Sequence, residues 1–360
     1  AGAAGATAAY CLSAGGARVL VIEKASLPRY KACGGAVPRR VYSQFPFSFE
    51  DVIESEPARV TYCWQASQRV TIPLDSRPIT MVMRDRFDWH ILERAGAEIR
   101  DGTAIRAVEN AGTGVRITTD AGEVVTGDYL VGADGAISSI ARLVGLRRRR
   151  ALTAAIEAEV YPPPNVFARH AGGALLDFGV LPYGYLWIFA KRDHLSVGIG
   201  QFEGKLSDLR ATLLREMARL GIELAGVPLH GHTLPLYQGP EPRMAGRVLL
   251  VGDAAGLADP LSGEGIRHAV TSGRLAAEAI LRGQAGQYAR AIERYAGRAL
   301  RPILLLAHIF YRHPWACFRY GVRNPRATRL FAGWLNGATG KAGVMTGLAL
   351  CLIEGLVRAP

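Results

Sequence analysis

The chain has 360 residues, of which 49% are hydrophobic and 21% charged, a composition typical of a globular protein that excludes a disordered one. Lys and Arg outnumber Asp and Glu by 43 to 31, and the net charge of +12 favours an anionic partner such as a membrane surface, a diphosphate or a nucleic acid. The five cysteines show no paired spacing, which favours reduced thiols in the cytoplasm over a disulfide framework. The sequence shows no secretory signal, and its longest apolar run, 344–353, is about half the length of a membrane span.

The chain opens on a glycine-rich turn around Gly2 and Gly5. A small, apolar helical run follows at 7–14 and ends at a pair of glycines. Residues 18–23 are then a continuous apolar strand, which is typical of a parallel sheet buried on both faces. Because such a turn comes after a strand in the fold, we expect the first strand to be missing from this sequence.

The same glycines and one acid have the spacing of a dinucleotide-binding fingerprint. Gly2 and Gly5 match the last two glycines of G-x-G-x-x-G, and Glu23 lies 18 positions after Gly5, close to the roughly 20 expected for an acid that holds a ribose. Glycine lets the backbone approach a pyrophosphate, whose charge the helix N-terminus favours. Tight packing of small residues between helix and strand is the alternative explanation.

Two further apolar runs end in glycine and aspartate. Residues 129–135 lead to Asp134, and residues 247–256 contain Asp253. Ligands of open α/β sheets collect at such strand ends. For Asp134, a plain strand-end turn is the alternative, since Asp-Gly is a common turn pair.

The segment between these two strands has a different pattern. Alternating runs such as 185–189 and 194–199 predict a mostly antiparallel sheet, and from Thr271 onward the pattern is helical. We therefore predict an α/β protein, α+β overall, with a discontinuous Rossmann-type domain, an antiparallel-sheet domain and a helical C-terminal region. The predicted boundaries are 1–50, 80–150 and 241–290 for the Rossmann-type domain, 51–79 and 151–240 for the sheet domain, and 291–360 for the helical region.

Several sequence blocks occur in one characteristic order. They are the opening glycines with Glu23, K-x-C-G-G at 31–35, R-x-x-F-D at 84–88, the DG pair at 134–135, and G-D-A-A-G at 252–256 running into D-P-L-S-G-E-G-I at 259–266, with Y-x-W-x-F at 185–189 between the last two. Together they resemble the geranylgeranyl reductase family, within the flavoprotein superfamily that includes p-hydroxybenzoate hydroxylase. The chain departs from the family pattern at three positions, where Ala190 replaces a proline, Asp259 an asparagine and Ser262 a threonine.

The resemblance implies an FAD-dependent reductase that hydrogenates C=C bonds of a geranylgeranyl-type prenyl chain. NAD(P)H would be the electron donor, binding transiently on the FAD domain because the sequence has no second fingerprint. In the family pattern Arg84 approaches the FAD, Asp253 bonds its ribityl or ribose hydroxyls, and Asp134 helps to bind both nucleotides.

A helix is predicted to begin at Gly263, Gly265 and Ile266 and to be aimed at the flavin's N1–C2=O edge, where its positive end stabilises the anionic reduced form. Its small residues Val270, Gly273, Ala277 and Ile280 are predicted to pack on the sheet. The remaining cofactor-binding residues implied by the resemblance are Gly2, Gly5, Glu23, Lys24, Cys33 and Gly34. We predict no metal site.

Cys33 is the implied catalytic residue, since a thiol near the flavin can protonate the alkene carbon opposite hydride attack. Filling of a tight turn beside two glycines is the alternative. Tyr185, Trp187 and Phe189 share one strand face and are predicted to line a prenyl channel, with ordinary sheet core as the alternative.

The C-terminal region is basic, with eight Arg and Lys and no acid between 295 and 353. Residues 308–320 mix arginines with Phe310, Tyr311, Trp315 and Phe318, a composition that favours an anionic bilayer surface. A monotopic attachment through which prenyl lipid enters and a helical cap with a polar face both stay open. Nucleic acid is disfavoured, because aliphatic runs such as 303–307 separate the basic residues. A second basic run, 147–150, is interpreted as a solvated loop.

Rival functions share some of these blocks. A flavin monooxygenase or halogenase has the fingerprint, DG and GD blocks, and a non-redox flavoprotein isomerase or cyclase also binds FAD. An inactive truncated fragment is a third alternative. The sequence does not choose among geranylgeranyl diphosphate, a geranylgeranylated pigment, an ether lipid and a quinone side chain as substrate, nor does it indicate an oligomeric state. We expect a cytoplasmic enzyme, free or peripheral on the membrane.

Overall fold

The computed structural model describes residues 1–74, 77–146, 153–324 and 326–327. The basic run at 147–150 and the apolar run at 344–353 lie outside the described residues. The chain divides into two compact units. The first comprises Ala1–Lys31, Arg84–Leu152 and Thr233–Leu306, and the second comprises Ala32–Met83, Thr153–His232 and Ala307–Pro360.

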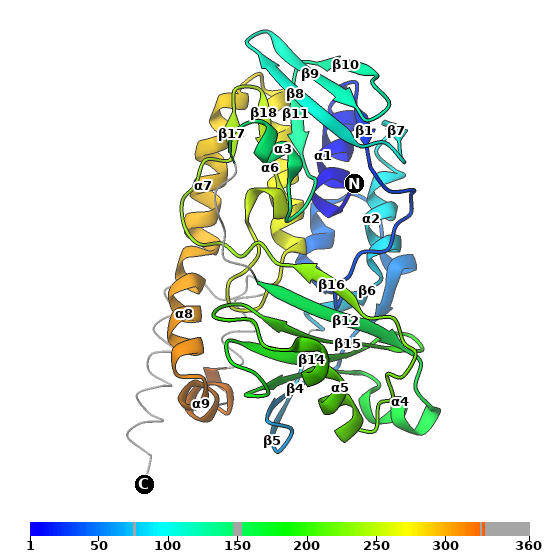
Figure 1. Cartoon of the computed structure of the whole chain (residues 1–360), viewed down its shortest axis with the longest axis vertical. Coiled ribbons are helices and arrows are strands. Elements are labelled where there is room, and N and C mark those ends of the chain that lie inside the picture. The colour runs from blue at the N-terminus through cyan, green and yellow to red at the C-terminus, as the bar shows by residue number, and fades with distance from the viewer. Residues whose placement is uncertain (75–76, 147–152, 325, 328–360) are drawn as a thin grey trace. The chain divides into compact units, whose positions relative to one another are not determined.

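Short parallel strands form the centre of the first unit (Figure 1). β1 (Leu20–Ile22) pairs in parallel with β7 (Glu98–Arg100), and β11 (Leu130–Gly132) with β18 (Val248–Leu250), whose other edge carries β17 (Met244–Ala245). The strands predicted before Asp134 and Asp253 are therefore neighbours. The prediction for 18–23 is wrong in length and burial, because β1 has three half-buried residues and pairs with β7 alone among the described strands.

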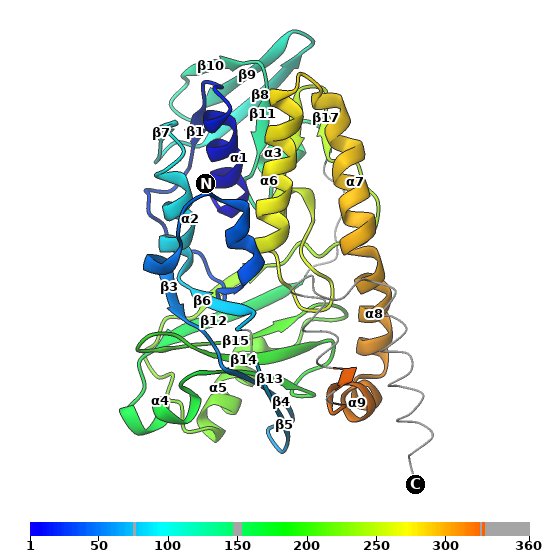
Figure 2. The ribbon, with the colours of Figure 1, turned by 180° about the vertical axis from the view of Figure 1, so that it is seen from behind.

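Two helices of the first unit pack backbone to backbone. α1 (Ala3–Ala14) lies beside α6 (Ile266–Leu281), as Figure 2 shows. A Cβ on Gly273 would lie 2.4 Å from the carbonyl oxygen of Ala4 and 3.2 Å from the backbone N of Ala8, so only glycine fits. The small face predicted to pack on the sheet therefore includes a residue that packs on α1 instead.

Further elements surround this centre. α2 (Arg84–Leu92) contacts α1, and an antiparallel sheet of β8 (Ile105–Ala111), β9 (Gly114–Thr119) and β10 (Val124–Gly127) precedes β11. α3 (Ser139–Leu143) follows β11, and α7 (Tyr288–Ala299) contacts α6. The Tyr288 hydroxyl anchors α7 by donating to the carbonyl oxygen of Leu250 at 2.5 Å.

A seven-stranded sheet dominates the second unit and confirms the predicted antiparallel pattern (Figure 1). In spatial order the strands are β16 (His230–Thr233), β12 (Ala154–Val160), β15 (Leu195–Gln201), β14 (Gly184–Ala190), β13 (Gly173–Phe178), β4 (Arg59–Trp64) and β5 (Gln68–Pro73). All its described pairings are antiparallel except that of β13 with β4. α4 (Pro164–His170) and α5 (Leu209–Arg219) help to close an apolar core with this sheet, in which Leu213 and Met217 of α5 are fully buried.

Residues 32–50 fall in the second unit and not in the first, where their sequence motif would place them. β2 (Ala36–Pro38) and β3 (Ile53–Ser55) both pair with β6 (Ile79–Val82), and the 3₁₀ helices η1 (Arg39–Gln44) and η2 (Glu50–Val52) lie between them in sequence. The ladder of β2 with β6 joins segments about 40 residues apart, a long-range pairing that local sequence patterns do not reveal.

The C-terminal helices of the described chain are α8 (Arg301–Arg312), α9 (Pro314–Ala316) and the π-helical η5 (Cys317–Val322). Most aromatic residues assigned there to a membrane surface are instead buried in the second unit. Phe310 lies 5.2 Å from Phe178 and Phe318 lies 5.6 Å from Trp64, measured between ring centroids, and Tyr311 is 5% exposed. Trp315 alone of the four is exposed.

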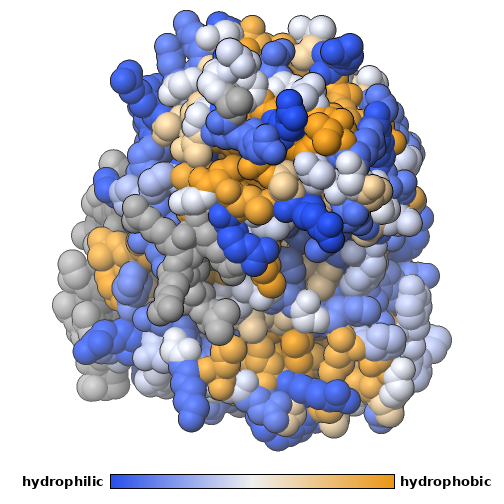
Figure 3. Space-filling model, turned by 45° about the horizontal axis from the view of Figure 1, so that its top comes forward, coloured by the Kyte–Doolittle hydropathy of each residue, from blue (hydrophilic) through white to orange (hydrophobic). Residues whose placement is uncertain are grey.

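The surface mixes polar and apolar side chains. Figure 3 shows hydrophobic patches bordered by hydrophilic residues on the face that it presents. On α8, Leu305 and Ile309 are exposed at 57% and 45%, one helical turn apart. None of the helices that the structure describes is both long and apolar enough to cross a bilayer.

Candidate functional site

The N-terminus of α1 offers unpaired backbone donors. Its N-cap is Gly2, which makes no side-chain cap bond, so the first-turn N–H groups remain available to a ligand. A Cβ on Gly2 would lie 3.5 Å from Nη2 of Arg29, 3.8 Å from Oδ2 of Asp88 and 3.9 Å from Nη2 of Arg84. The N-terminus of α1 therefore lies beside two guanidinium groups and the carboxylate that binds one of them, and the guanidinium groups suit a phosphate. Gly5 allows α1 to approach Ala133 closely, because a Cβ added at Gly5 would lie 3.1 Å from the Cβ of Ala133.

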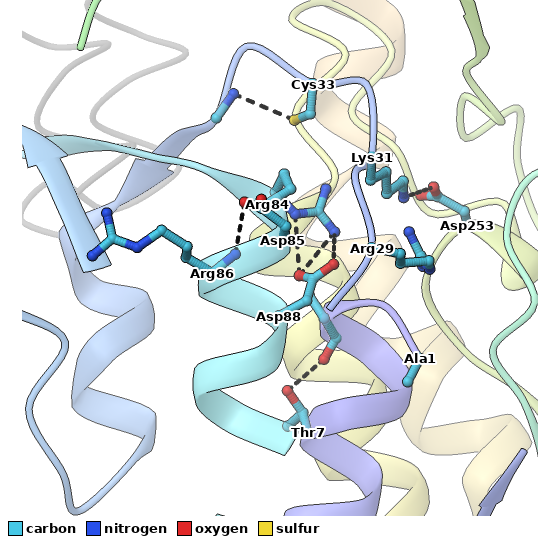
Figure 4. A network of polar contacts seen from close by, with 12 residues as sticks. Ala1, Thr7, Arg29, Lys31, Cys33, Arg84, Asp85, Arg86, Asp88 and Asp253 are labelled. Atoms are coloured by element: carbon cyan, nitrogen blue, oxygen red, sulfur yellow. Dashed lines mark hydrogen bonds and ion pairs between the residues drawn. The ribbon is translucent and has the colours of Figure 1, made fainter. Parts of the chain in front are cut away.

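Arg84 is the first residue of α2 and is 6% exposed. Its Nε and Nη2 donate to the carboxylate of Asp88, one turn further along the helix, at 2.8 to 3.1 Å (Figure 4). Burial lowers the pKa of Arg29, which Asp88 opposes. Asp88 thus neutralises part of the positive charge that Arg29 and Arg84 place beside the start of α1.

Glu23 follows β1, as the fingerprint requires, and is 7% exposed. Its carboxylate accepts from the backbone N of Ala25 at 3.1 Å and from Nε of Arg29 at 3.3 Å. The carboxylate is therefore fixed beside the cationic start of α1. Lys24, assigned to the cofactor site by resemblance, has an exposed side chain.

Asp253 lies in the 3₁₀ turn η3 (Gly252–Ala255), directly after β18. Its Oδ2 is 3.0 Å from Nζ of Lys31, with both side chains largely buried. The loop that starts α6 comes close as well, since a Cβ on Gly265 would be 3.4 Å from Oδ1 of Asp253. The K-x-C-G-G, G-D-A-A-G and G-E-G-I blocks thus converge here through Lys31, Asp253 and Gly265.

The turn before α6 is tightly hydrogen-bonded. Gly263 has φ +69°, a conformation that favours glycine, Gly265 is the N-cap, and Ile266 begins the helix as predicted. Oδ1 of Asp259 accepts from the backbone N atoms of Leu261 and Ser262, both at 2.9 Å. An aspartate therefore performs the turn-forming role expected of the family's asparagine.

A buried polar network behind this turn was not predicted from the sequence. Glu264 accepts from Nε of Arg267 at 3.1 Å, and Nδ1 of His268 lies 2.8 Å from the Tyr295 hydroxyl. Arg267 is 6% exposed and His268 fully buried. The i, i+3 spacing of Glu264 and Arg267 was visible, but an exposed ion pair has the same spacing.

Asp134 is committed to its own loop. Its carboxylate accepts from the hydroxyl groups of Ser138 and Ser139, at 2.5 and 3.0 Å, and from the backbone N of Ile140 at 2.9 Å. These bonds satisfy donors at the start of α3 and correspond to the strand-end turn that was the alternative explanation. The Asp134 side chain is nevertheless exposed.

In the second unit, Gly34 of K-x-C-G-G lies against β14, and Gly35 lies against Val82 of β6 and against Lys191, the residue that follows β14. Cys33 Sγ accepts from the backbone N of Gly35 at 3.4 Å. A Cβ on Gly34 would lie 2.9 Å from the ring of Phe189 and 3.0 Å from Nε1 of Trp187. Lys191, missed by sequence reasoning, is 2% exposed and donates from Nζ to the carbonyl oxygen of Val82 at 2.6 Å.

Tyr185, Trp187 and Phe189 form a continuous aromatic row on one face of β14, with successive ring centroids 6.3 Å apart. Leu186 and Ile188 point to the opposite face, into the core closed by α5. Trp187 is 7% exposed, and its Nε1 has no hydrogen-bond partner among the described residues. A Cβ on Gly198 of β15 would lie 2.2 Å from the indole, so glycine makes room for it.

These features fit an FAD site in the first unit. The glycine-capped α1 and its two guanidinium groups suit a pyrophosphate, Glu23 suits a ribose, and the turn before α6 suits the charged edge of a flavin. Burial of these groups reduces competition from water for the ligand.

Comparison with solved structures identifies the fold. The fold is shared with a geranylgeranyl bacteriochlorophyll reductase-like protein from Thermoplasma acidophilum, which aligns over 99% of this chain and 95% of its own with 19% identity and a TM-score of 0.75. The halogenase PltM, solved as a mutant in complex with FAD, aligns over 93% and 80% with 17% identity and a TM-score of 0.70.

Sequence comparison identifies the family. A geranylgeranyl diphosphate reductase of Rhodobacter capsulatus is 30% identical over 301 residues, 78% of this chain and 73% of its own length. A chloroplastic geranylgeranyl diphosphate reductase of Oryza sativa is 34% identical over 311 residues. The chain belongs to the geranylgeranyl reductase family and is a flavoprotein oxidoreductase. It spans 65% of the length of the rice protein, and no family model matches it.

Proposed function

We propose that this protein is an FAD-dependent reductase that hydrogenates C=C bonds of a geranylgeranyl-type prenyl chain, with NAD(P)H as the transient donor. The observation that carries the proposal is the start of α1, where Gly2 leaves unpaired backbone donors beside Arg29 and Arg84. Family membership indicates the kind of substrate.

The first unit would hold the cofactor. The pyrophosphate would bind at Gly2 and Gly5, a ribose at Glu23, and the ribityl hydroxyls at Asp253. The start of α6 would direct backbone N–H groups at the flavin edge. FAD, when bound, would supply a two-electron carrier between NAD(P)H and the alkene.

Cys33 would supply the proton for the second alkene carbon. Its Sγ accepts a weak hydrogen bond from the backbone N of Gly35, which leaves the S–H hydrogen free to point elsewhere. Because isolated alkenes accept hydride poorly, protonation must accompany the transfer and water must be kept out.

The aromatic row of β14 would bind the prenyl chain. Tyr185, Trp187 and Phe189 form a row of rings along one strand face, with successive ring centroids 6.3 Å apart. Each buried CH₂ contributes about 0.8 kcal/mol, so a chain of roughly twenty carbons needs little help from its head group.

The test is an anaerobic incubation of the purified flavoprotein with NADPH and a geranylgeranyl substrate. We expect reoxidation of the reduced flavin and products heavier by two hydrogens for each reduced double bond. A product formed only with oxygen would point to a monooxygenase or halogenase, and a product of unchanged mass to an isomerase. Either outcome refutes the proposal.

A further inference from the structure

Asp259 carries a negative charge that its turn does not need. The Oδ1 atom of Asp259 accepts both hydrogen bonds of the turn, from the backbone N atoms of Leu261 and Ser262, and Asp259 is 2% exposed. An asparagine Oδ1 accepts the same two bonds without a charge. Because an ionised carboxylate is costly to bury, an amide would be the cheaper residue for a purely structural turn.

Arg267, in the first turn of α6, carries the charge opposite to that of Asp259. The backbone N of Asp259 donates to the carbonyl oxygen of Glu264 at 2.9 Å, and the Glu264 side chain accepts from Arg267, whose backbone N lies 2.7 Å from Oε1 and whose Nε lies 3.1 Å from Oε2. Although burial acts to lower the pKa of Arg267, Glu264, Tyr295 and Asp259 raise it overall. Arg267 is therefore a permanent cation in the first turn of α6.

His268 fixes the position of this cation. Nη2 of Arg267 lies 3.1 Å from Nε2 of His268, and a guanidinium only donates, so Nε2 must be the acceptor. The proton of a neutral imidazole is then on Nδ1, which donates to the Tyr295 hydroxyl at 2.8 Å. The guanidinium is thus held between Glu264 and His268, whose Nε2 also lies 3.6 Å from Oε2 of Glu264.

We propose that Asp259 and Arg267 are positioning residues of opposite sign that set the reduction potential of the flavin bound at the start of α6. The inference rests on the proposed function. Reduction adds negative charge to the flavin, so the Asp259 carboxylate disfavours the reduced form and Arg267 favours it. The extra carboxylate at 259 makes the flavin a stronger hydride donor, as an unactivated alkene requires.

The test compares two charge-removing variants with matched controls on the same helix. D259N keeps the acceptor atom of the turn, and R267M removes the guanidinium while keeping much of its length. The controls are R274M and E278Q, which remove the charges of an exposed pair on α6 whose atoms lie 2.8 Å apart. Flavin midpoint potentials are measured by equilibration with reference dyes, together with FAD affinity and thermal unfolding.

We expect D259N to shift the midpoint to more positive values and R267M to more negative values. A tenfold change in the equilibrium between reduced and oxidised flavin corresponds to about 30 mV for a two-electron couple. The controls should leave the midpoint unchanged. Shifts of the same sign in both variants, or no shift in D259N, would overturn the inference while the protein still binds FAD. If R267M does not fold, D259N alone decides.

A wild-type protein that folds but takes up no FAD would refute the proposed function instead. The two failures are therefore distinguishable, because the inference is tested only on protein that already carries the flavin.

Discussion

Nζ of Lys31 lies 3.0 Å from Oδ2 of Asp253, although the two residues are 222 positions apart in the chain. Lys31 belongs to the K-x-C-G-G block and Asp253 to the G-D-A-A-G block. The ion pair neutralises a carboxylate at the end of β18 and ties the segment before Cys33 to the proposed ribityl site.

Replacement of this lysine should loosen both the fold and the cofactor site. K31M leaves the Asp253 carboxylate largely buried without its cation, and we expect a loss of about 1–3 kcal/mol in the free energy of unfolding and weaker FAD binding. Urea unfolding and flavin titration measure the two effects. K205M, at an exposed lysine of the second unit, should change neither. Unaltered FAD affinity in K31M would argue against a role for the pair at the site.

Arg84 and Asp88 should show strong energetic coupling. R84M removes the guanidinium that donates to the buried Asp88 carboxylate, at an expected cost of about 3–5 kcal/mol in unfolding free energy. The double variant R84M/D88L removes both charges and should recover most of that stability. If Arg84 also binds FAD, the double variant will fold well and still bind FAD weakly. Recovery of both properties would limit Arg84 to a structural role.

The role of Cys33 can be separated from cofactor binding. If its thiol supplies the proton, C33A should retain FAD and be reduced by NADPH at the wild-type rate, while prenyl hydrogenation falls by about 10²- to 10⁴-fold. Stopped-flow absorbance follows the two half-reactions. C11A provides a control at another half-buried cysteine. A hydrogenation rate in C33A equal to that of the wild type would assign Cys33 to turn packing.

The carboxyl group of Asp177 is expected to make the free energy of unfolding of the protein depend on pH. Burial raises its pKa to about 6, although the backbone N of Ala66 donates to it at 2.8 Å. The folded state therefore holds the proton more tightly than the unfolded state, and the stability contribution is complete below about pH 4 and lost as pH rises towards 6.

D177N should remove this dependence and stabilise the protein at pH 7 by up to about 3 kcal/mol, because asparagine carries no charge. Urea unfolding at pH 4.5 and pH 7 measures it. E203Q, at an exposed acid, serves as the control. A D177N variant less stable than the wild type at pH 7 would contradict the assignment.

Peripheral membrane contact remains a proposal, and α8 offers a direct test. Leu305 and Ile309 are exposed and lie one turn apart, with Arg301 and Arg312 exposed at the two ends of the helix. We expect L305D/I309D to reduce cosedimentation with vesicles of anionic lipid by at least severalfold without loss of folding. L206D, at another exposed leucine, should have no effect. Equal binding by all three proteins would exclude this helix face.

Local patterns predicted the elements that surround the proposed cofactor site. The apolar runs ending in glycine and aspartate correspond to β11 and β18, and α6 begins at Ile266 as predicted. These boundaries are visible in the sequence because a glycine ends a strand or starts a helix through its own backbone conformation, without a distant partner. Alternation likewise predicted β14 and β15, the centre of the antiparallel sheet.

Features that depend on distant partners were not predicted. Phe310 and Phe318 looked like residues of a membrane interface, but they are buried because β4 and β13 supply Trp64 and Phe178 opposite them. Lys191 drew no attention because nothing in its neighbourhood in sequence shows that it will be buried against the carbonyl oxygen of Val82. Burial of a charge is a property of the assembled fold.

The crossing of α1 and α6 fixes more than a packing distance. Gly273 allows the two backbones to touch, and each helix begins where one end of a long dinucleotide would lie. The contact between the two helices therefore sets the distance between the start of α1 and the start of α6. A single methyl group at Gly273 would lie 2.4 Å from the carbonyl oxygen of Ala4 and would force the two backbones, and with them the two helix starts, apart.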